Sequence, residues 1–462
     1  MSRSIPELLA PELREVVGRE YVRADAGSLE RYGQDALGIG HPPDLVVIPA
    51  DTNQIAAIAR LCDERRVPLT VRGAGTGYTG GAVPTRGGVL LSLERLNRIL
   101  EIDETNLLAV VEPGVITGDL QRAVEAVGLF YPPDPASLDI SSIGGNVAEC
   151  AGGPRGFKYG TTRRYVLALE AVLPGGEIIH TGSKAVKNVV GYDLTQLLVG
   201  SEGTLAIITR VTLRLVPKPP ARATLRALFG DIRGAVTAVS TLIRRRVVPA
   251  TIELIDAASL EAVREHLGRD LAPRDTGAML IVEADGTEAA VAEEIDVAAQ
   301  ACRDAGATAV ALASGDEERE QIWTARRLIS LALRATGLLK INHDVVVPRG
   351  RVPDLFAVIQ GLRDRFGLRI VAFGHAGDGN IHVNLMVDRD NADERARAAQ
   401  AERVLFERVV ALEGSISGEH GIGFAKAPYL GIELSAEAMA LMKRVKAAFD
   451  PHGILNPGKI FP

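Results

Sequence analysis

Cysteine is scarce in this chain. Cys62, Cys150 and Cys302 are far apart in 462 residues, and no two of them form a CxxC pair. Disulfide scaffolds, zinc ribbons and iron–sulfur clusters need closely spaced cysteines, so the sequence argues against each of them within the chain. Cys62 falls on the apolar face of an expected helix and is predicted to be a buried core residue. A reducing cytoplasm fits this cysteine usage.

Long apolar runs and excess positive charge are missing as well. No apolar stretch approaches the roughly 18 residues of a membrane span, and the N-terminus lacks the charged-then-apolar pattern of a signal peptide. The net charge is −6, whereas nucleic-acid binding normally needs a basic face. The sequence therefore predicts a soluble, cytoplasmic protein, or one held at a membrane through a partner, with no transmembrane segment and no nucleic-acid partner.

Glycine, in contrast, is abundant. The chain has 48 glycines, and clusters of them lie at 73–88, 144–160 and 374–379, which is typical of loops that build a site and not of linkers. A chain of this length is too long for one compact core, so two or three domains are expected.

The N-terminal half alternates strands and helices. Strands are expected at 45–49, 69–71, 88–93, 107–112 and 205–216, with helices capped by Thr52 and Thr117 and a hairpin formed by 166–174 and 177–180. Three prolines at 217–220 mark a domain boundary, because proline continues neither a helix nor a sheet. Beyond them, strands at 250–256 and 279–284 alternate with helices at 232–247, 286–305 and 391–413. This pattern predicts an α+β domain with an antiparallel sheet and helices on one face.

The segment from Arg72 to Ala82 contains GxGxxG at positions 75, 77 and 80. A dinucleotide fingerprint needs a helix that starts inside the motif, and Gly81, Pro84, Gly87 and Gly88 forbid one here. The alternatives are a flexible loop or a helix-free nest of backbone N–H groups that binds phosphate, with Arg72 adding a charged fork.

A second cluster contains histidine. His375 and His382 bracket a strong turn, Gly377-Asp378-Gly379-Asn380, between strand-like runs 369–373 and 381–386, and Glu419-His420 lies between two glycines. A histidine is otherwise most often a surface or hydrogen-bonded core residue. Two histidines and one carboxylate, however, form an open metal triad, compatible with zinc, iron or manganese. A metallohydrolase would leave the glycine loop unexplained, and no HExxH helix is present.

Eight segments in order resemble the FAD-linked D-2-hydroxyacid dehydrogenases of the vanillyl-alcohol oxidase class, which include the glycolate oxidase flavin subunit, D-lactate dehydrogenase and D-2-hydroxyglutarate dehydrogenase. Besides Arg72–Ala82, the segments are 132–137, 143–148, 187–194, Gly200-Ser201-Glu202-Gly203-Thr204, 374–382, Gly418-Glu419-His420-Gly421 and Asn456-Pro457-Gly458-Lys459. The resemblance implies a PCMH-type FAD-binding domain at 1–217, an α+β substrate (cap) domain on an antiparallel sheet at 218–413, and a C-terminal segment, 414–462, that returns to the flavin.

The same resemblance implies which residues bind FAD. The expected positions are Arg72, Gly73, Gly75, Thr76, Gly77, Gly80 and Gly81 at the pyrophosphate, Pro133, Asp134, Ser137, Gly144, Gly145 and Asn146 at the isoalloxazine, Glu202 and Gly203 near the adenine half, and Gly152, Gly160 and Asn456. Relatives with covalent flavin carry histidine where Thr76 stands, so non-covalent FAD is expected.

For the chemistry, the resemblance implies His375, His382 and Glu419 as ligands of a divalent metal, and His420 as the base while hydride passes to flavin N5. Arg326 would grip the substrate carboxylate and Asn384 would supplement it.

Relatives that act on a dicarboxylate carry lysine where Asn342 stands, and Lys340 is out of register. A small 2-hydroxy acid, D-lactate or glycolate, is therefore favoured as substrate.

Two other functions stay open at this point. The chain could be the flavin subunit of a multi-subunit glycolate oxidase, or a transferase similar to alkylglycerone-phosphate synthase, which would not require the complete metal triad. A dehydrogenase of this kind needs a separate electron acceptor, namely an iron–sulfur subunit, an electron-transfer flavoprotein or a quinone. The sequence leaves the oligomeric state open.

Overall fold

The computed structural model of the protein describes residues 5–461, which divide into two compact units. The first unit combines the chain up to Ala151, Thr161–Lys218 and the segment from Glu419 onward; the second combines Gly152–Gly160 with Pro219–Gly418. The main junction lies one residue from the boundary expected from the prolines, and the C-terminal return begins five residues later than expected. The short excursion at 152–160 has no counterpart in the sequence prediction.

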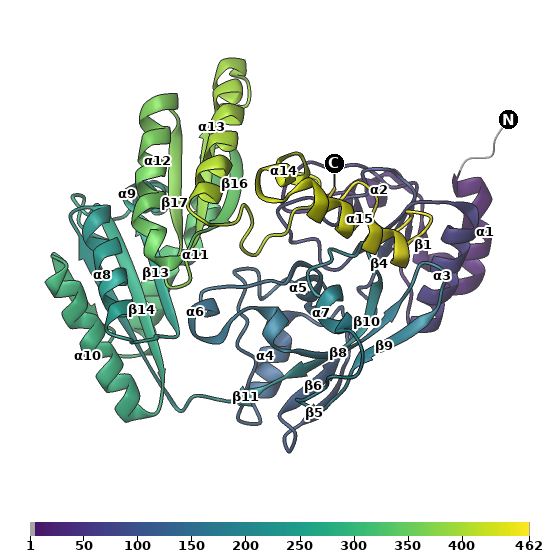
Figure 1. The fold of residues 1–462 in the computed structure, drawn as a ribbon, viewed down its shortest axis with the longest axis horizontal. Coiled ribbons are helices and arrows are strands. Elements are labelled where there is room, and N and C mark those ends of the chain that lie inside the picture. The colour runs from purple at the N-terminus through teal and green to yellow at the C-terminus, as the bar shows by residue number, and fades with distance from the viewer. Residues whose placement is uncertain (1–4, 462) are drawn as a thin grey trace. The chain divides into compact units, whose positions relative to one another are not determined.

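The first unit opens with a four-stranded sheet in the order β1-β2-β4-β3, in which β2, β4 and β3 run parallel. Figure 1 labels β1 and β4 of this sheet. Its strands are β1 (Val22–Arg23), β2 (Leu45–Val47), β3 (Leu69–Arg72) and β4 (Val89–Ser92), and its helices are α1 (Ile5–Val17), η1 (Arg19–Tyr21), α2 (Ala26–Tyr32) and α3 (Thr52–Arg65). Strands buried on both faces read as unbroken apolar runs, as β2 does. The helices α1 and α3 share one core with this sheet, and Cys62 lies in it, as predicted.

Two of the predicted helix caps were wrong. Helix α3 is capped by Asp51, whose carboxylate accepts a 2.9 Å hydrogen bond from the N–H of Gln54, and Thr52 is already helical. Helix α4 (Thr117–Glu125) follows Ile116 and has no side-chain cap. The hydroxyl of Thr117 donates instead to a backbone carbonyl 3.1 Å away. The cap of α3 therefore lies one residue earlier than predicted, and α4 begins without a side-chain cap because the Thr117 hydroxyl has a tertiary partner.

The second sheet of this unit is antiparallel, in the order β5-β6-β10-β8-β9. Its strands are β5 (Ile99–Asp103), β6 (Leu108–Val111), β8 (Val166–Val172), β9 (Ile178–Gly182) and β10 (Ile207–Arg214). The shorter elements are β7 (Leu129–Phe130), which pairs with β11 (Val216–Pro217), α5 (Ile143–Glu149), η2 (Thr162–Arg164) and α7 (Leu194–Leu198). The β8–β9 hairpin confirms the prediction from its two-glycine turn.

The second unit is built on one antiparallel sheet of seven strands, in the order β15-β12-β14-β13-β17-β18-β16. These strands are β12 (Ala221–Phe229), β13 (Thr251–Asp256), β14 (Ala278–Gly286), β15 (Ala309–Leu312), β16 (Leu339–Val346), β17 (Arg369–His375) and β18 (Asn380–Val387). The turn between His375 and His382 does join two adjacent antiparallel strands, β17 and β18. The antiparallel sheet and this hairpin agree with the sequence prediction.

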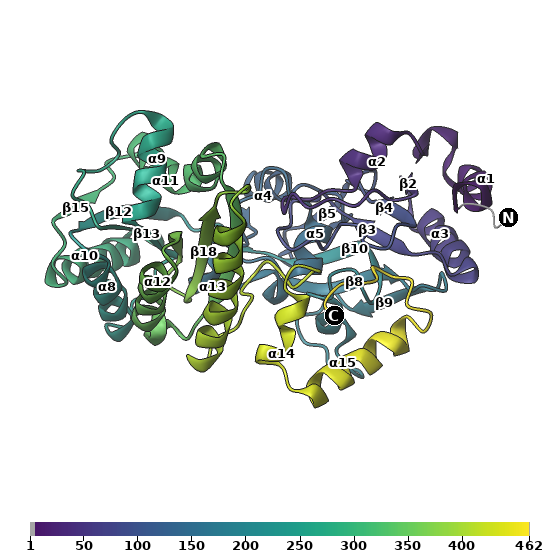
Figure 2. The ribbon, with the colours of Figure 1, turned by 90° about the horizontal axis from the view of Figure 1, so that it is seen from above.

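Helices cover both faces of this sheet, and the expectation of a single covered face was wrong. Figure 2 shows α9 (Ala257–Leu267) and α11 (Asp316–Ala335) on one side, and α8 (Ile232–Arg244), α10 (Glu288–Asp304), α12 (Val352–Phe366) and α13 (Ala392–Ala411) on the other. The short elements of the unit are α6 (Gly156–Tyr159) and η3 (Arg349–Arg351). Glu253, Ile255 and Phe373 face α9 and α11, with which the two apolar residues share a core. Because this face carries polar side chains such as Glu253 among its apolar ones, the alternation of polar and apolar residues along the strands does not reveal that it is buried.

The C-terminal segment contains η4 (Ala427–Tyr429), α14 (Leu430–Glu433) and α15 (Ala436–Phe449) and then runs beside β3. The N–H of Leu69 donates to Ile454, and the N–H of Asn456 donates to Leu69, both over 2.8 Å. The end of the chain is thus joined to the strand that leads into the glycine loop. No helix within residues 5–461 is both long and apolar enough to cross a membrane.

Candidate active site

The glycine loop follows β3 directly. No helix lies within 73–88 before β4 begins at Val89, which confirms that the GxGxxG motif does not open a helix as a Rossmann fingerprint would. Gly75 and Gly80 have φ values of +70° and +80°. A Cβ on Gly80 would lie 2.1 Å from the ring of Phe424, so both backbone conformation and space require glycine there.

Arg72 lies beneath this loop. A Cβ on Gly75 would lie 2.1 Å from the guanidinium, which donates to the carbonyls of Tyr32 (3.2 Å) and Gln34. Burial lowers the pKa of Arg72, although the nearby Asp35 carboxyl opposes this effect. The positive charge of Arg72 therefore lies against the backbone of the glycine loop, where the carbonyls of Tyr32 in α2 and of Gln34 bind its guanidinium.

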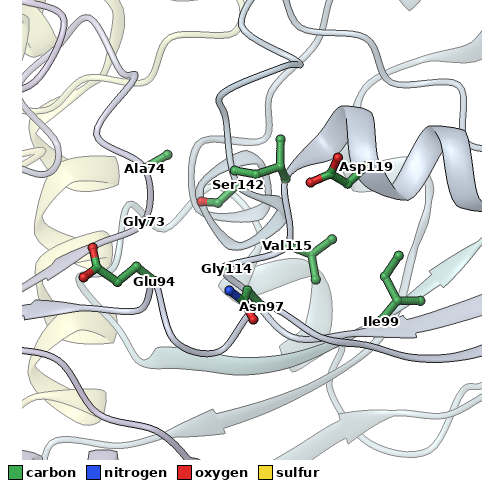
Figure 3. Close-up of a pocket in the computed structure, with 10 residues that line it drawn as sticks. Gly73, Ala74, Glu94, Asn97, Ile99, Gly114, Val115, Asp119 and Ser142 are labelled. Carbon is green, nitrogen blue, oxygen red and sulfur yellow. The ribbon is translucent and has the colours of Figure 1, made fainter.

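A cavity of about 270 Å³ opens beside the start of the loop (Figure 3). Gly73 and Ala74 line one side of it, and Ser142, Glu94 and Asp119 line others, although the carboxylate of Glu94 points away from the other labelled residues and accepts a hydrogen bond from the hydroxyl of Tyr32. Ligand pockets range from about 300 to 1,000 Å³, so this space suits one part of a dinucleotide.

The predicted isoalloxazine residues fall on two neighbouring segments. The backbone carbonyl of Pro133 accepts a 2.8 Å bond from Gln121, in a stretch that also holds Asp134 and Ser137. Gly144, Gly145 and Asn146 open helix α5. Asn146 donates to the Thr117 hydroxyl over 2.6 Å, which ties α5 to the start of α4.

Gly152 and Gly160 stand at the two ends of the segment that packs with the second unit. Between them, Lys158 and Tyr159 of α6 bind the carboxylate of Asp285 over 2.6 and 2.7 Å. The expected role of the two glycines at the flavin stays a prediction, as does that of the half-buried Thr76 and Gly77 in the glycine loop.

Glu202 and Asn456 hold the loop assembly together. The carboxylate of Glu202, whose pKa is raised by burial, accepts 2.7 Å bonds from the N–H groups of Ile422 and Gly423. The amide of Asn456 donates to the carbonyls of Gly81 and Glu202 over 2.8 and 2.7 Å. Next to Glu202, Gly203 adopts φ +65°. These residues connect the glycine loop to the segment that carries His420.

The three predicted metal ligands converge. His375 and His382 are buried on the β17–β18 hairpin, and with Glu419 they bring one ligand atom each within 4.8 Å of one another. Glu419 directly follows Gly418, whose N–H is 2.8 Å from the Asp344 carboxylate of β16. Ligands about 2.1 Å from one ion lie at most about 4.2 Å apart, so this spacing is near the one that a bound metal requires. The donor set fits a divalent metal with open positions.

Arg326 projects from α11 to the same face of the sheet. Its Nε donates to the fully buried carboxylate of Glu253, and its guanidinium lies 4.7 Å from the centre of the Phe373 ring. Glu253 also bonds Nδ1 of His375. Burial raises the pKa of Glu253, but Arg326 and His375 outweigh that and leave it lowered.

Sequence reasoning missed Glu253, which stands in the middle of a buried strand. The only signal was a carboxylate in an otherwise apolar strand, TIELID, and nothing local identifies its partners. A second missed residue is Asp344, opposite His382 in register, which anchors Gly418.

Asn384 lies two residues after His382 and therefore on the same face of β18. It is fully buried, accepts a 2.6 Å bond from Asn342 and donates to Val371 over 3.3 Å. Lys340, on the same face of β16, donates to Ser330 of α11 over 2.8 Å. Burial, together with Arg334 and Arg326, lowers the pKa of Lys340 to about 8.

His420 is held against the glycine loop. Its ring is 5.2 Å from that of Tyr78, and its backbone carbonyl accepts a 3.0 Å bond from the hydroxyl of Thr79. Its Nε2 lies 3.9 Å from the carboxylate of Glu419. A predicted base and a predicted metal ligand are thus consecutive residues of one pinned loop.

Comparison with known proteins identifies the family of the chain. Residues 43–182 match the family described as FAD binding domain, and residues 218–460 match FAD linked oxidases, C-terminal domain. Glycolate oxidase subunit GlcD of Bacillus subtilis is 46% identical over 91% of this chain and 89% of its own length. D-lactate dehydrogenase of Anaerostipes hadrus is 36% identical over 90% of this chain and 89% of its own.

Solved structures share the fold at low identity. The 4-ethylphenol oxidase of Gulosibacter chungangensis superimposes with a TM-score of 0.79 at 22% identity and covers all of this chain, 98% of its own. An alkyldihydroxyacetonephosphate synthase gives 0.76 at 19%, covering 98% of this chain and 85% of its own. The fold is of the PCMH type that the sequence predicted. The chain belongs to the FAD-linked oxidases, as an FAD-binding oxidoreductase of the glycolate oxidase and D-lactate dehydrogenase family.

Proposed function

We propose that the protein oxidises a small D-2-hydroxy acid, D-lactate or glycolate, to the 2-oxo acid with the help of a divalent metal. The observation that carries the proposal is the convergence of two imidazoles and a carboxylate, from His375, His382 and Glu419, within 4.8 Å. Nothing in the FAD-binding unit alone requires such a set.

The triad suits a metal that binds substrate. Two nitrogen ligands and one oxygen leave coordination positions open, and zinc, iron and manganese all accept this set. His375, His382 and Glu419 would hold such an ion, which would act as a Lewis acid toward a 2-hydroxy acid and make its hydroxyl easier to deprotonate. His375 and His382 are buried, which keeps competing water away from their side of the ion.

His420 is the proposed base. It follows Glu419 directly, so a substrate bound at the metal would lie within reach of its imidazole. A neutral imidazole accepts a hydroxyl proton near neutral pH. Thr79 and Tyr78 hold the backbone and ring of His420, which limits the orientations it can adopt.

Arg326 is the proposed anchor for the substrate carboxylate. A guanidinium presents five N–H donors in a planar fork, and the bond to Glu253 engages Nε. The outer edge of the fork matches a carboxylate in geometry. Asn384 would supplement it from β18, by exchanging its present bond to Asn342.

Bound FAD would supply the two-electron acceptor, taking the hydride from the substrate Cα at N5. The glycine loop supports phosphate binding, and the cavity lined by Gly73, Glu94 and Asp119 supports placing adenosine there. That position differs from the one expected around Glu202, whose carboxylate is engaged by Ile422 and Gly423. Thr76 supports non-covalent binding, since its side chain offers no imidazole for attachment.

The electrons must then leave to a separate acceptor. Cys62 and Cys302 are buried, and burial raises the pKa of each thiol to about 12. All three cysteines are free and isolated within the part of the chain that the structure describes. An iron–sulfur subunit, an electron-transfer flavoprotein or a quinone is the proposed partner.

The test is anaerobic reduction of the purified, FAD-loaded protein, supplied in turn with zinc, iron or manganese. D-lactate or glycolate should bleach the flavin, and D-2-hydroxyglutarate should do so far more slowly. Absence of bleaching by all three acids with every metal would contradict the proposal. A His382→Ala protein should retain FAD but lose metal, and unchanged metal content would refute the triad.

A further inference from the structure

Glu253 occupies an unusual place for a carboxylate. It lies in β13, directly opposite His375 of β17 in register, and is fully buried. An ion at such a position is costly unless charged or hydrogen-bonding partners compensate. Both of its oxygens are engaged, one by Nδ1 of His375 and the other by Nε of Arg326.

We propose that Glu253 is a positioning residue that sets both the metal-facing nitrogen of His375 and the orientation of Arg326. The inference rests on the proposed function, in which His375 binds metal and Arg326 binds the substrate carboxylate. It adds one buried side chain that links the two.

The effect on His375 follows from hydrogen-bond chemistry. An ionised carboxylate only accepts, so the proton of a neutral His375 must lie on Nδ1. The lone pair is then on Nε2, which faces away from Glu253. A carboxylate behind a ligating imidazole fixes its tautomer and ring orientation and makes it a stronger ligand.

The effect on Arg326 follows from the planarity of the guanidinium. With Nε bound to Glu253 and the flat face 4.7 Å from the centre of the Phe373 ring, its rotation about the side chain is restricted. The outer N–H groups are therefore presented in one direction before substrate arrives. Loss of Glu253 should weaken metal binding and substrate binding together.

The experiment compares Zn²⁺ affinity of FAD-loaded wild type and Glu253→Gln by competition with a fluorescent chelator. Removing such a carboxylate lowers metal affinity about 10- to 100-fold, and that loss is expected here. Glu283→Gln is the matched control, because Glu283 is buried on the same face but bonds Thr224 and Trp323. The Zn²⁺ affinity of Glu283→Gln should stay within about twofold of wild type. That change is small compared with the loss expected when a carboxylate that hydrogen-bonds a metal-ligating histidine is removed.

A folded Glu253→Gln protein with wild-type Zn²⁺ affinity would overturn the inference. If that variant does not fold, the ¹⁵N-histidine spectrum of metal-free wild type decides. The His375 signal, assigned by its loss in His375→Asn, should show the proton on Nδ1, and a proton on Nε2 would overturn the inference. Wild type that takes up no Zn²⁺ would contradict the proposed metal centre itself, whereas equal affinities of wild type and Glu253→Gln contradict only the role of Glu253.

Discussion

Replacement of Asn456 by alanine should loosen the glycine loop without changing the proposed metal ligands. The Asn456 amide is buried and donates to the carbonyls of Gly81 and Glu202 over 2.8 and 2.7 Å. Its backbone is left-handed, with φ +43°. Asparagine tolerates this conformation better than alanine does.

The expected cost combines two effects. Two lost hydrogen bonds cost about 1 kcal/mol each, and alanine in the left-handed region adds about 1 kcal/mol. Asn456→Ala should therefore lower the free energy of unfolding by about 3 kcal/mol. Asn456→Gly avoids the backbone strain and should cost about 2 kcal/mol, so the difference between the variants isolates the backbone contribution.

The assay is urea unfolding followed by circular dichroism, with FAD affinity from fluorescence titration of the apoprotein. Asn106→Ala is the control, since that exposed amide bonds Asp103 within its own turn and should cost under about 0.5 kcal/mol. Both Asn456 variants should bind FAD more weakly than wild type. An Asn456→Ala protein with the stability of the control and undiminished FAD affinity would refute the role of this amide.

Three further changes test other parts of the structure. Gly423 has φ +52°, and in Gly423→Ala the Cβ would lie 2.0 Å from the carbonyl oxygen of Thr79. The loop that carries His420 should therefore shift, and turnover should fall at least about tenfold, because small misplacements of catalytic groups cost about that much. Wild-type turnover would show that the loop tolerates the displacement. Burial raises the pKa of Asp35 to about 6, so its ionisation costs stability as pH rises from about 4 to above 6. Asp35→Asn should therefore raise the thermal midpoint at pH 7.5, with a gain that shrinks as pH falls through about 6 and disappears below about 4; a gain independent of pH would contradict the assignment. Asp51→Ala should lower the free energy of unfolding by about 1 kcal/mol, because α3 loses its cap; urea unfolding measures this change. Thr52→Ala should leave the cap of α3 intact, since Thr52 does not supply it.

The glycine loop and the histidine turn were readable from sequence because their chemistry is local. Glycines at 75 and 80 and the break at 84–88 exclude a helix whatever the rest of the chain does, and the structure has none there. The turn between His375 and His382 depends only on residues between them, and the strands on either side do pair.

Contacts between distant segments were not readable. Asp51 and Thr52 are both capping residue types. The hydroxyl of Thr52 instead donates to the carboxylate of Glu170, 118 positions later, over 2.9 Å. The second helical layer on the cap sheet was hidden because polar residues such as Glu253 interrupt its apolar face.

The sequence by itself thus determined the flavin class, the helix-free loop and the residue types of the proposed metal triad. Only the tertiary structure decided what surrounds them. A buried carboxylate such as Glu253 is stable only when cations or donors from other elements face it, here His375 from β17 and Arg326 from α11. Such compensation depends on which strands and helices become neighbours, and residue types along one strand do not encode that.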